Sequence, residues 1–177
     1  MCVSTASSAH LQVLKLWHLQ DRTFRRPIAE LRLQLNCAEA CKTPLHEACA
    51  DLLVHLISDA LTETAYLASV CEVGSSLAAN ESGLSIRVHG FDDKMLDLFS
   101  VMWSMLLSFR GRSENDRLPA DIREGRFEAC LEVYRRNCAN HGLKASKLAG
   151  TCRVRCLRPK SWSTNQKVSF FDVPFVM

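Results

Sequence analysis

Apolar residues between positions 44 and 70 recur every three or four residues, which is the spacing of one face of an α-helix. Thr43 and Pro44 stand where this pattern begins, and threonine caps helices while proline suits their first turn. The opposite face carries polar residues such as Glu47 and Asp51. The pattern therefore predicts an amphipathic helix over residues 44–70.

Three segments around this helix are predicted to be strands. Over residues 29–35 leucines alternate with charged and amide side chains, and the same period of two occurs over 84–89. Residues 73–80 precede the second of these segments, and Gly83 between them suits a turn that requires a positive φ. We therefore predict an antiparallel sheet of at least three strands.

Further helices are predicted after this hairpin. An apolar stripe runs from Met95 to Phe109, with Asp92 or Asp93 placed to cap its helix. Two more helices are expected over 119–139 and 144–157. Long helices packed on one face of an antiparallel sheet define an α+β fold.

The composition is that of a globular domain, with 177 residues of which 47% are hydrophobic and 23% charged. This length buries a sizeable core within one domain. The 22 basic and 19 acidic residues leave a formal net charge of +3, which argues against a dedicated nucleic-acid or membrane-surface binder. No apolar run approaches the roughly 18 residues of a transmembrane helix.

The chain carries nine cysteines, an odd number. Its start, Met1-Cys2-Val3-Ser4-Thr5, has no basic segment and no long apolar stretch, so we expect no signal peptide. Cys49, Cys71 and Cys130 fall on apolar faces of predicted helices, where a free cysteine behaves as a small hydrophobic residue. We therefore predict a reducing, cytoplasmic location.

Six short motifs occur in a particular order between residues 15 and 162. They are Lys15-Leu16-Trp17 followed by Gln20-Asp21, Phe24 and Pro27; Pro44-Leu45-His46; Leu61-x-Glu63-x-Ala65-Tyr66; Gly90-Phe91-Asp92-Asp93-Lys94; Arg126-Phe127-Glu128; and Trp162. Each motif alone is weak, but their order and spacing together are specific. In this order they resemble the middle, third domain of the insulysin/nardilysin branch of the pitrilysin-type zinc metallopeptidases.

The resemblance implies a fold and a different role for each structural unit. Members of this family consist of four related α+β units, which form two halves around a closed chamber. Their first unit binds zinc through an inverted His-x-x-Glu-His motif and a downstream glutamate, and the glutamate of the motif is the general base. The third unit forms chamber wall and inter-domain contacts. Because that unit continues with further strands, we expect the sheet of this chain to be incomplete.

No residue of this chain stands at a matching zinc or catalytic position. His46-Glu47 begins like a His-Glu-x-x-His zinc helix, but Ala50 replaces the second histidine. None of the six histidines starts a His-x-x-Glu-His motif. We therefore predict no catalytic, cofactor-binding or metal-binding residue and no peptidase activity of the chain alone. The zinc of the parent family would be bound by a domain absent here.

Two other interpretations of the side chains remain open. Cys37-x-x-x-Cys41 and Cys152-x-x-x-Cys156, with Cys130, Cys138 and His141 near the second pair, are possible metal ligands, although cysteines four apart on a helix are also typical of a buried face. The basic residues of the C-terminal third lack interleaved aromatic residues, which favours a solvated face or a surface that meets an acidic neighbouring domain over a nucleic-acid site. These basic residues are Arg135, Arg136, Arg153, Arg155, Arg158 and Lys160.

We therefore divide the chain into an N-terminal extended segment or linker (1–28), a middle α+β domain of a pitrilysin-type peptidase (29–162) and an irregular tail (163–177). The predicted function is that of a non-catalytic portion of an insulin-degrading-enzyme/nardilysin-like zinc metalloendopeptidase. Its expected partners are the other domains or a full-length relative, and the peptide substrates of the parent enzyme, with no nucleic acid and no membrane. The alternatives are a stand-alone interaction module that docks on a full-length relative and, less favoured, a Cys/His metal-binding domain.

Overall fold

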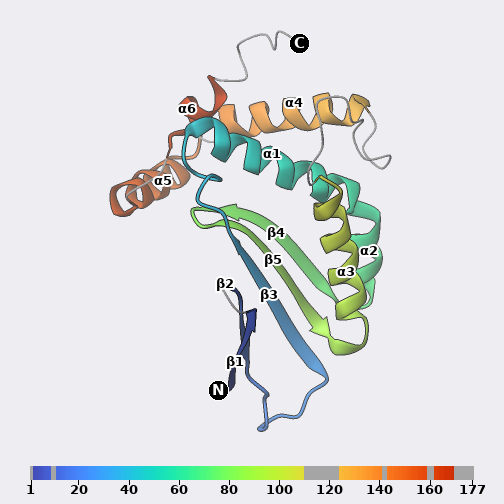
Figure 1. Ribbon diagram of the computed structural model, residues 1–177. Coiled ribbons are helices and arrows are strands. Elements are labelled where there is room, and N and C mark those ends of the chain that lie inside the picture. The colour runs from blue at the N-terminus through green and yellow to red at the C-terminus, as the bar shows by residue number, and fades with distance from the viewer. Residues whose placement is uncertain (1, 9–10, 110–123, 141–142, 159–161, 170–177) are drawn as a thin grey trace.

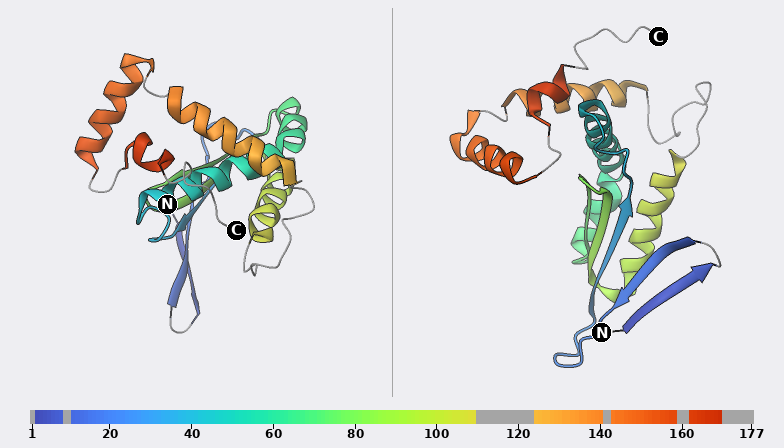
Figure 2. Two further views of the ribbon diagram at one scale, coloured as in Figure 1. Left: turned by 90° about the horizontal axis from the view of Figure 1, so that it is seen from above. Right: turned by 60° about the vertical axis from the view of Figure 1, so that its left-hand side comes forward.

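The computed structural model describes residues 2–8, 11–109, 124–140, 143–158 and 162–169 (Figures 1 and 2). Its main sheet has three antiparallel strands, Ile28–Asn36 (β3), Gly74–Asn80 (β4) and Gly83–Phe91 (β5), in the order β3-β5-β4. Cys2–Ser8 (β1) and Leu11–His18 (β2) pair in a separate two-stranded sheet within the segment predicted to be extended. The predicted three-stranded antiparallel sheet is confirmed.

The register of the sheet separates an apolar face from a polar one. Leu31 pairs with Val88 and Leu33 with Ile86, so leucines, isoleucine and valine share one side. The helices on that side are Pro44–Ala60 (α1), Thr62–Val70 (α2) and Asp92–Ser108 (α3). The predicted α+β fold, with long helices on one face of an antiparallel sheet, is therefore confirmed.

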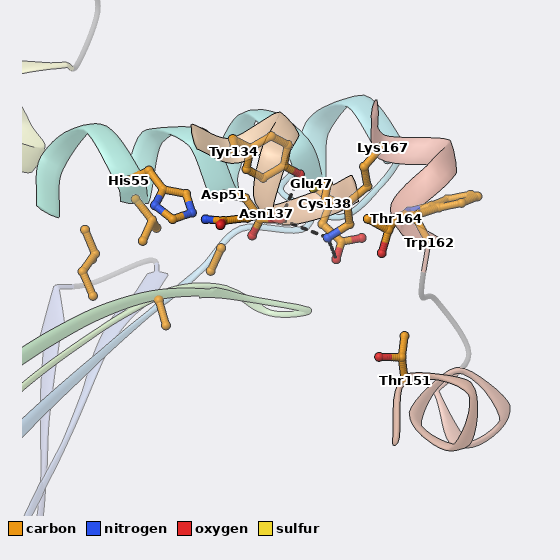
Figure 3. A pocket seen from close by; sticks show the side chains of 14 residues that line it. Glu47, Asp51, His55, Tyr134, Asn137, Cys138, Thr151, Trp162, Thr164 and Lys167 are labelled. Atoms are coloured by element: carbon orange, nitrogen blue, oxygen red, sulfur yellow. Dashed lines mark hydrogen bonds and ion pairs between the residues drawn. The ribbon is translucent and has the colours of Figure 1, made fainter. Parts of the chain in front are cut away.

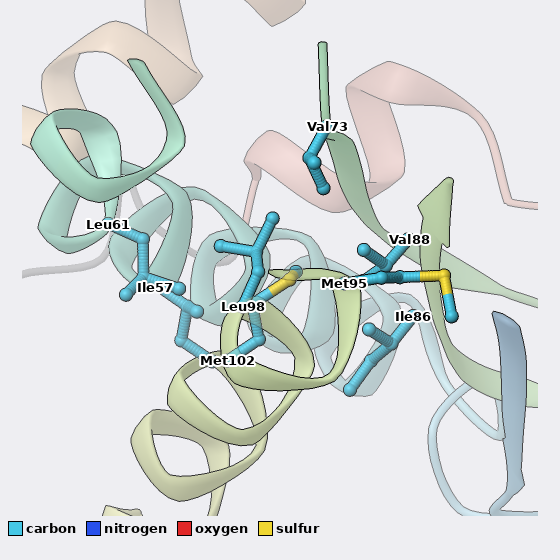
Figure 4. Close-up of a cluster of buried hydrophobic side chains, with 8 residues drawn as sticks. All are labelled: Ile57, Leu61, Val73, Ile86, Val88, Met95, Leu98 and Met102. Atoms are coloured by element: carbon cyan, nitrogen blue, oxygen red, sulfur yellow. The ribbon is translucent and has the colours of Figure 1, made fainter. Parts of the chain in front are cut away.

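The main core lies between this face of the sheet and the helices (Figure 4). Its buried members come from α1, β5 and α3 and from the residues that follow α1 and precede β4, and they are Ile57, Leu61, Val73, Ile86, Val88, Met95, Leu98 and Met102. Burial of such side chains contributes roughly 1.5–3 kcal/mol each. This core holds α1 and α3 against the centre of the sheet.

A second, smaller core joins α1 to Glu124–Asn140 (α4), which runs along the side of α1 away from the sheet (Figure 1). Its buried members are Ala48, Leu52, Leu56 and Tyr134.

The helix predicted over 119–139 is found from Glu124 onward, and residues 119–123 lie outside the described residues. Ala145–Leu157 (α5) and Thr164–Val168 (α6) follow.

The single helix predicted over 44–70 is two helices, because the chain turns at Leu61. There the backbone has φ −93° and ψ 5°, outside the helical range. The Thr62 hydroxyl donates to the carbonyl of Ser58 at 3.0 Å, a bond of the type that bends helices. The buried Leu61 side chain keeps both helices on the core.

Two glycines occupy positions that a side chain would not tolerate. Gly83 has φ +133° and Gly90 has φ +138°. The positive φ of Gly83 is the one that the predicted turn requires. A Cβ at Gly83 would overlap the carbonyl oxygen of Leu35, and one at Gly90 would overlap that of Glu72. Gly90, a member of the Gly-Phe-Asp-Asp-Lys motif, thus lets the end of β5 pass close to the backbone after α2.

Two sequence predictions at helix ends are wrong. The N-cap of α3 is Phe91, with no side-chain cap, because Asp92 and Asp93 are already helical and lie in the first turn. Their carboxylates are placed at the positive end of the helix dipole instead. In the C-terminal segment that was predicted to be irregular, α6 forms because Ser163 and Gln166 build a capping box.

Candidate interaction site at the junction of α1, α4 and α6

A pocket of about 500 Å³ lies between α1, β4, α4 and α6 (Figure 3). Its lining combines carboxylates, an amine, aromatic rings and small apolar groups. The lining residues are Glu47, Asp51, Val54, His55, Leu77, Ala78, Ala79, Tyr134, Asn137, Cys138, Thr151, Trp162, Thr164 and Lys167.

Lys167 is the electrostatic centre of this site. Its Nζ lies 2.6 Å from Glu47 Oε1 and 3.0 Å from Asp51 Oδ2. The two carboxylates stand four residues apart on α1, so both face the same side of that helix. The Lys167 side chain is only 15% exposed. The lysine therefore ties the short helix α6 to α1 in partly dehydrated surroundings.

The acidic surroundings control the protonation of Lys167 and Tyr134. Burial by itself disfavours the charged amine, but the hydrogen bonds to Glu47 and Asp51 outweigh it and raise the pKa of Lys167 above its ordinary value. Burial, with the charge of Asp51, raises the pKa of Tyr134, whose hydroxyl donates to Asp51 Oδ2 at 3.4 Å. Both groups thus keep their protons at neutral pH.

Two further hydrogen bonds hold the rim of the site. The Trp162 indole Nε1 donates to the carbonyl oxygen of Cys41 at 3.3 Å, and the Cys41 thiol donates to that of Asn80 at 3.2 Å. Burial raises the pKa of Cys41, so it stays a thiol. These bonds connect the segment before α6 to the loop before α1 and to the end of β4.

The donor groups of this site do not fit a zinc centre. Glu47 is engaged by Lys167, and the His46 ring Nδ1 lies 2.7 Å from the Thr43 hydroxyl at the helix cap. Ala50 offers no ligand. Throughout the described part of the chain, no three His, Cys, Asp or Glu side chains gather as a metal site. The charged groups of the junction form an ion-pair network that ties α6 to α1.

The cysteines singled out in the sequence lie in separate environments. Cys41 is buried at the junction, whereas Cys37 is exposed, and Cys152 and Cys156 are exposed on α5. His141 lies outside the described residues. Of the three cysteines assigned to apolar helix faces, Cys49 and Cys71 are exposed, while Cys130 is partly buried against the second core.

A second polar feature occupies the face of the sheet opposite the helices. Arg87 Nε lies 2.8 Å from Glu30 Oε1, and Arg32 also pairs with this oxygen. The hydrogen bonds from Arg87, and then from Arg32, lower the pKa of Glu30 to about 2. Because Arg32 and Arg87 are directly opposite in the register, Glu30 offsets the repulsion between two like charges.

Several residues of the sequence motifs are exposed instead of packed. Trp17 is 59% exposed, Phe24 72% and Tyr66 67%. Tyr66 lies on α2 beside Leu67 and Val70, which are exposed to a similar degree. Large apolar side chains clustered in this way are typical of surfaces that another protein covers.

Lys167 was not recognised from the sequence as a functional residue. The sequence feature that points to a basic partner is the pair Glu47 and Asp51, which stand four residues apart and place two negative charges on one side of α1. The sequence does not show which of the 22 lysines and arginines pairs with them.

The fold and the motif positions identify the class of protein. Residues 9–170 match the family described as the middle or third domain of peptidase M16. The chain therefore belongs to the M16 peptidase family, as a middle domain, and the predicted family is confirmed.

Known relatives agree with this assignment. The chain is 30% identical to human (Homo sapiens) nardilysin over 152 residues, which are 86% of this chain and 12% of nardilysin. It is 25% identical to a nardilysin-like protein of Arabidopsis thaliana over 90% of this chain and 14% of that protein. It is 27% identical to the insulin-degrading enzyme of Drosophila melanogaster over 72% of this chain and 12% of the enzyme. The chain thus spans only about an eighth of the length of these relatives.

The fold also matches a solved structure. The crystal structure of pitrilysin superimposes with a TM-score of 0.57 and 21% identity, over 70% of this chain and 12% of that one. This likeness agrees with the α+β fold of the chain.

Proposed function

We propose that this chain is a non-catalytic portion of an insulin-degrading-enzyme/nardilysin-like zinc metalloendopeptidase. The parent enzyme hydrolyses peptides, and this portion contributes chamber wall and inter-domain contacts. The observation that carries the proposal is the exposure of Trp17, Phe24 and Tyr66, which belong to the motifs shared with the family. Exposed aromatic side chains of this size are suited to packing against the surface of another domain.

The polar face of the sheet supports the role of chamber wall. A wall needs one side packed on helices and one side in contact with water. The register of β3 and β5 provides this, since their leucines, isoleucine and valine face the helices while Glu30, Arg32 and Arg87 stand on the opposite face.

The non-catalytic assignment rests on the side chains that could act as a general base or a zinc ligand. Glu47, the one acidic residue next to a histidine on α1, is neutralised by Lys167 and is unavailable as a general base. The zinc ion of the parent is therefore assigned to another domain.

A cytoplasmic location is part of the proposal, supported by the eight free thiols between Cys37 and Cys156. Neither a nucleic acid nor a membrane is proposed as a partner, and none of the described helices is long and apolar enough to cross a membrane.

A peptidase assay tests this proposal. The purified chain, incubated with a fluorogenic peptide, should show no hydrolysis above the buffer rate, with or without added zinc. Human nardilysin serves as the positive control. Hydrolysis by the chain alone that a chelator abolishes would overturn the proposal.

A stand-alone interaction module is the second candidate function. The same exposed aromatic residues favour it, because they would equally serve a chain that docks on an intact relative. Two forms of human nardilysin separate the candidates: the intact enzyme, and a gapped nardilysin that lacks the 152 residues matched by this chain. Binding to the gapped form alone supports a missing portion, whereas equal binding to the intact form supports a docking module.

A further inference from the structure

Helix α5 differs from the other long helices because none of its side chains is buried. It has 13 residues and stands to one side of the α1–α4 pair (Figures 1 and 2). The side that it turns to the rest of the molecule holds Gly150, Thr151 and Val154, which are half-buried, and Thr151 lines the pocket. The side chains on the outward side of α5 are exposed.

This outward side is an apolar stripe. Ala145, Leu148, Ala149, Cys152 and Cys156 recur at intervals of three and four residues, so they lie along one face of the helix, and all five are exposed. Leu148, the largest of them, is 47% exposed. Small side chains along such a stripe let a partner helix approach closely.

Basic residues border the stripe. At 100° per residue, Arg153 and Arg155 lie on opposite sides of it, and the sequence from Lys144 to Lys160 contains no acidic residue. Arg158 pairs with Glu81 at 2.5 Å. Among the described residues, no carboxylate forms an ion pair with Lys144, Lys147, Arg153 or Arg155, all of which are exposed. Lys144, Arg153 and Arg155 thus border the apolar stripe without an ion-pair partner among the described residues, while Lys147 lies on the other side of the helix.

We propose that α5 is a docking helix that inserts its outward stripe into an apolar groove rimmed by carboxylates on another domain of the parent peptidase. This inference rests on the proposed function and adds to it the surface and the charge of the contact. The stripe would exclude water, while Arg153 and Arg155 pair with carboxylates on the two rims.

The same features disfavour other partners. A nucleic-acid surface would pair cations with aromatic residues that stack on bases, and α5 has no aromatic residue. A membrane surface would need a broad stripe of large apolar side chains, whereas this stripe has Leu148 as its only one. A carboxylate-rimmed groove on a protein uses both the small apolar residues and the flanking arginines.

Binding to the gapped nardilysin, measured by biolayer interferometry, tests the inference. The double variant Arg153→Glu/Arg155→Glu should weaken binding by at least tenfold and flatten its dependence on salt. The variant Leu148→Gln/Cys152→Ser, which keeps the charge, should weaken it several-fold. The charge-matched control Lys42→Glu/Lys94→Glu, at exposed residues outside α5 and outside the exposed aromatic residues, should reduce binding less than twofold. Circular dichroism confirms that each variant folds.

The outcomes separate the two proposals. A complex that forms but is equally tight for all variants overturns the docking role of α5 and leaves the proposed function standing. Absence of any complex with the unaltered chain contradicts the proposed function, and with it this inference. Submicromolar binding to a 20-base-pair DNA duplex or to phosphatidylserine vesicles, lost in Arg153→Glu/Arg155→Glu, would overturn the protein-groove partner in favour of an anionic polymer or lipid.

Discussion

Lys167 is the residue on which the packing of α6 depends. Replacing it with methionine keeps most of its apolar length but leaves Glu47 and Asp51 partly buried without their cation. We expect Lys167→Met to lower the free energy of unfolding by about 1–2 kcal/mol, between the values typical of exposed and buried ion pairs. Urea denaturation measures the change. The control is Lys94→Met, which breaks an ion pair with Asp97 on a 74% exposed lysine and should cost under about 0.5 kcal/mol.

The pH dependence of this ion pair has a definite sign. The fold raises the pKa of Lys167 above its ordinary value of 10.5, so the charged amine stabilises the fold fully below that pH. Its contribution is lost as the pH rises through the raised pKa. The unaltered chain should therefore lose more stability than Lys167→Met above about pH 10.5. Identical losses in the two proteins, in urea titrations at pH 9 and pH 11.5, would contradict this assignment.

Gly90 is expected to be intolerant of any side chain. Gly90→Ala must place a Cβ against the carbonyl of Glu72 at a φ of +138°, which should destabilise the fold by about 1–3 kcal/mol. Gly125→Ala on α4 is the matched control, because nothing lies within 4 Å of its new Cβ. It should stabilise the chain by roughly 0.5–1 kcal/mol through helix propensity. Thermal unfolding of the two variants should shift in opposite directions.

Glu30 provides a test of the polar sheet face. Its carboxyl should titrate with a pKa of about 2, and Arg87→Gln should raise that pKa towards its ordinary value of 4.5. Carbon NMR of the labelled carboxyl follows the titration directly. A Glu30 carboxyl that titrates near 4.5 in the unaltered chain would show that the arginines do not hold it.

At the level of the elements, α5 should be the least stable of the long helices. Few buried contacts hold it, whereas α1 contributes to both cores. Amide hydrogen exchange, followed by mass spectrometry, should therefore be at least a hundredfold slower in α1 than in α5. Equal protection of the two helices in the isolated chain would mean that α5 has packing partners within the chain.

The sequence predicted those elements whose signal is local. The period of two in β3 and β5, the turn at Gly83 and the stripe of α3 follow from residues within a few positions of each other. The break at Leu61 was missed because apolar spacing continues across it, and α6 was missed because its capping box spans only four residues. The junction of Lys167 with Glu47 and Asp51 joins residues more than a hundred positions apart, and such pairing is set by the packing of the whole molecule.

At the level of the whole molecule, the sheet ends on both sides without a partner. In the order β3-β5-β4, the outer edges of β3 and β4 pair with no other described strand. Unpaired edges favour association between chains. We expect the isolated chain to be marginally stable and to aggregate at micromolar concentration on mild heating. A sharp, reversible two-state thermal transition of a monomer would contradict this expectation.

In the proposed function, this chain supplies packing surface to a peptidase whose catalytic groups lie on other domains. Mixing the chain with the gapped nardilysin and measuring the hydrolysis of a fluorogenic peptide tests this role. We expect each component alone to be inactive and the mixture to be active and sensitive to a chelator. A mixture that stays inactive although the two components bind, or a chain that hydrolyses the peptide by itself, would contradict it.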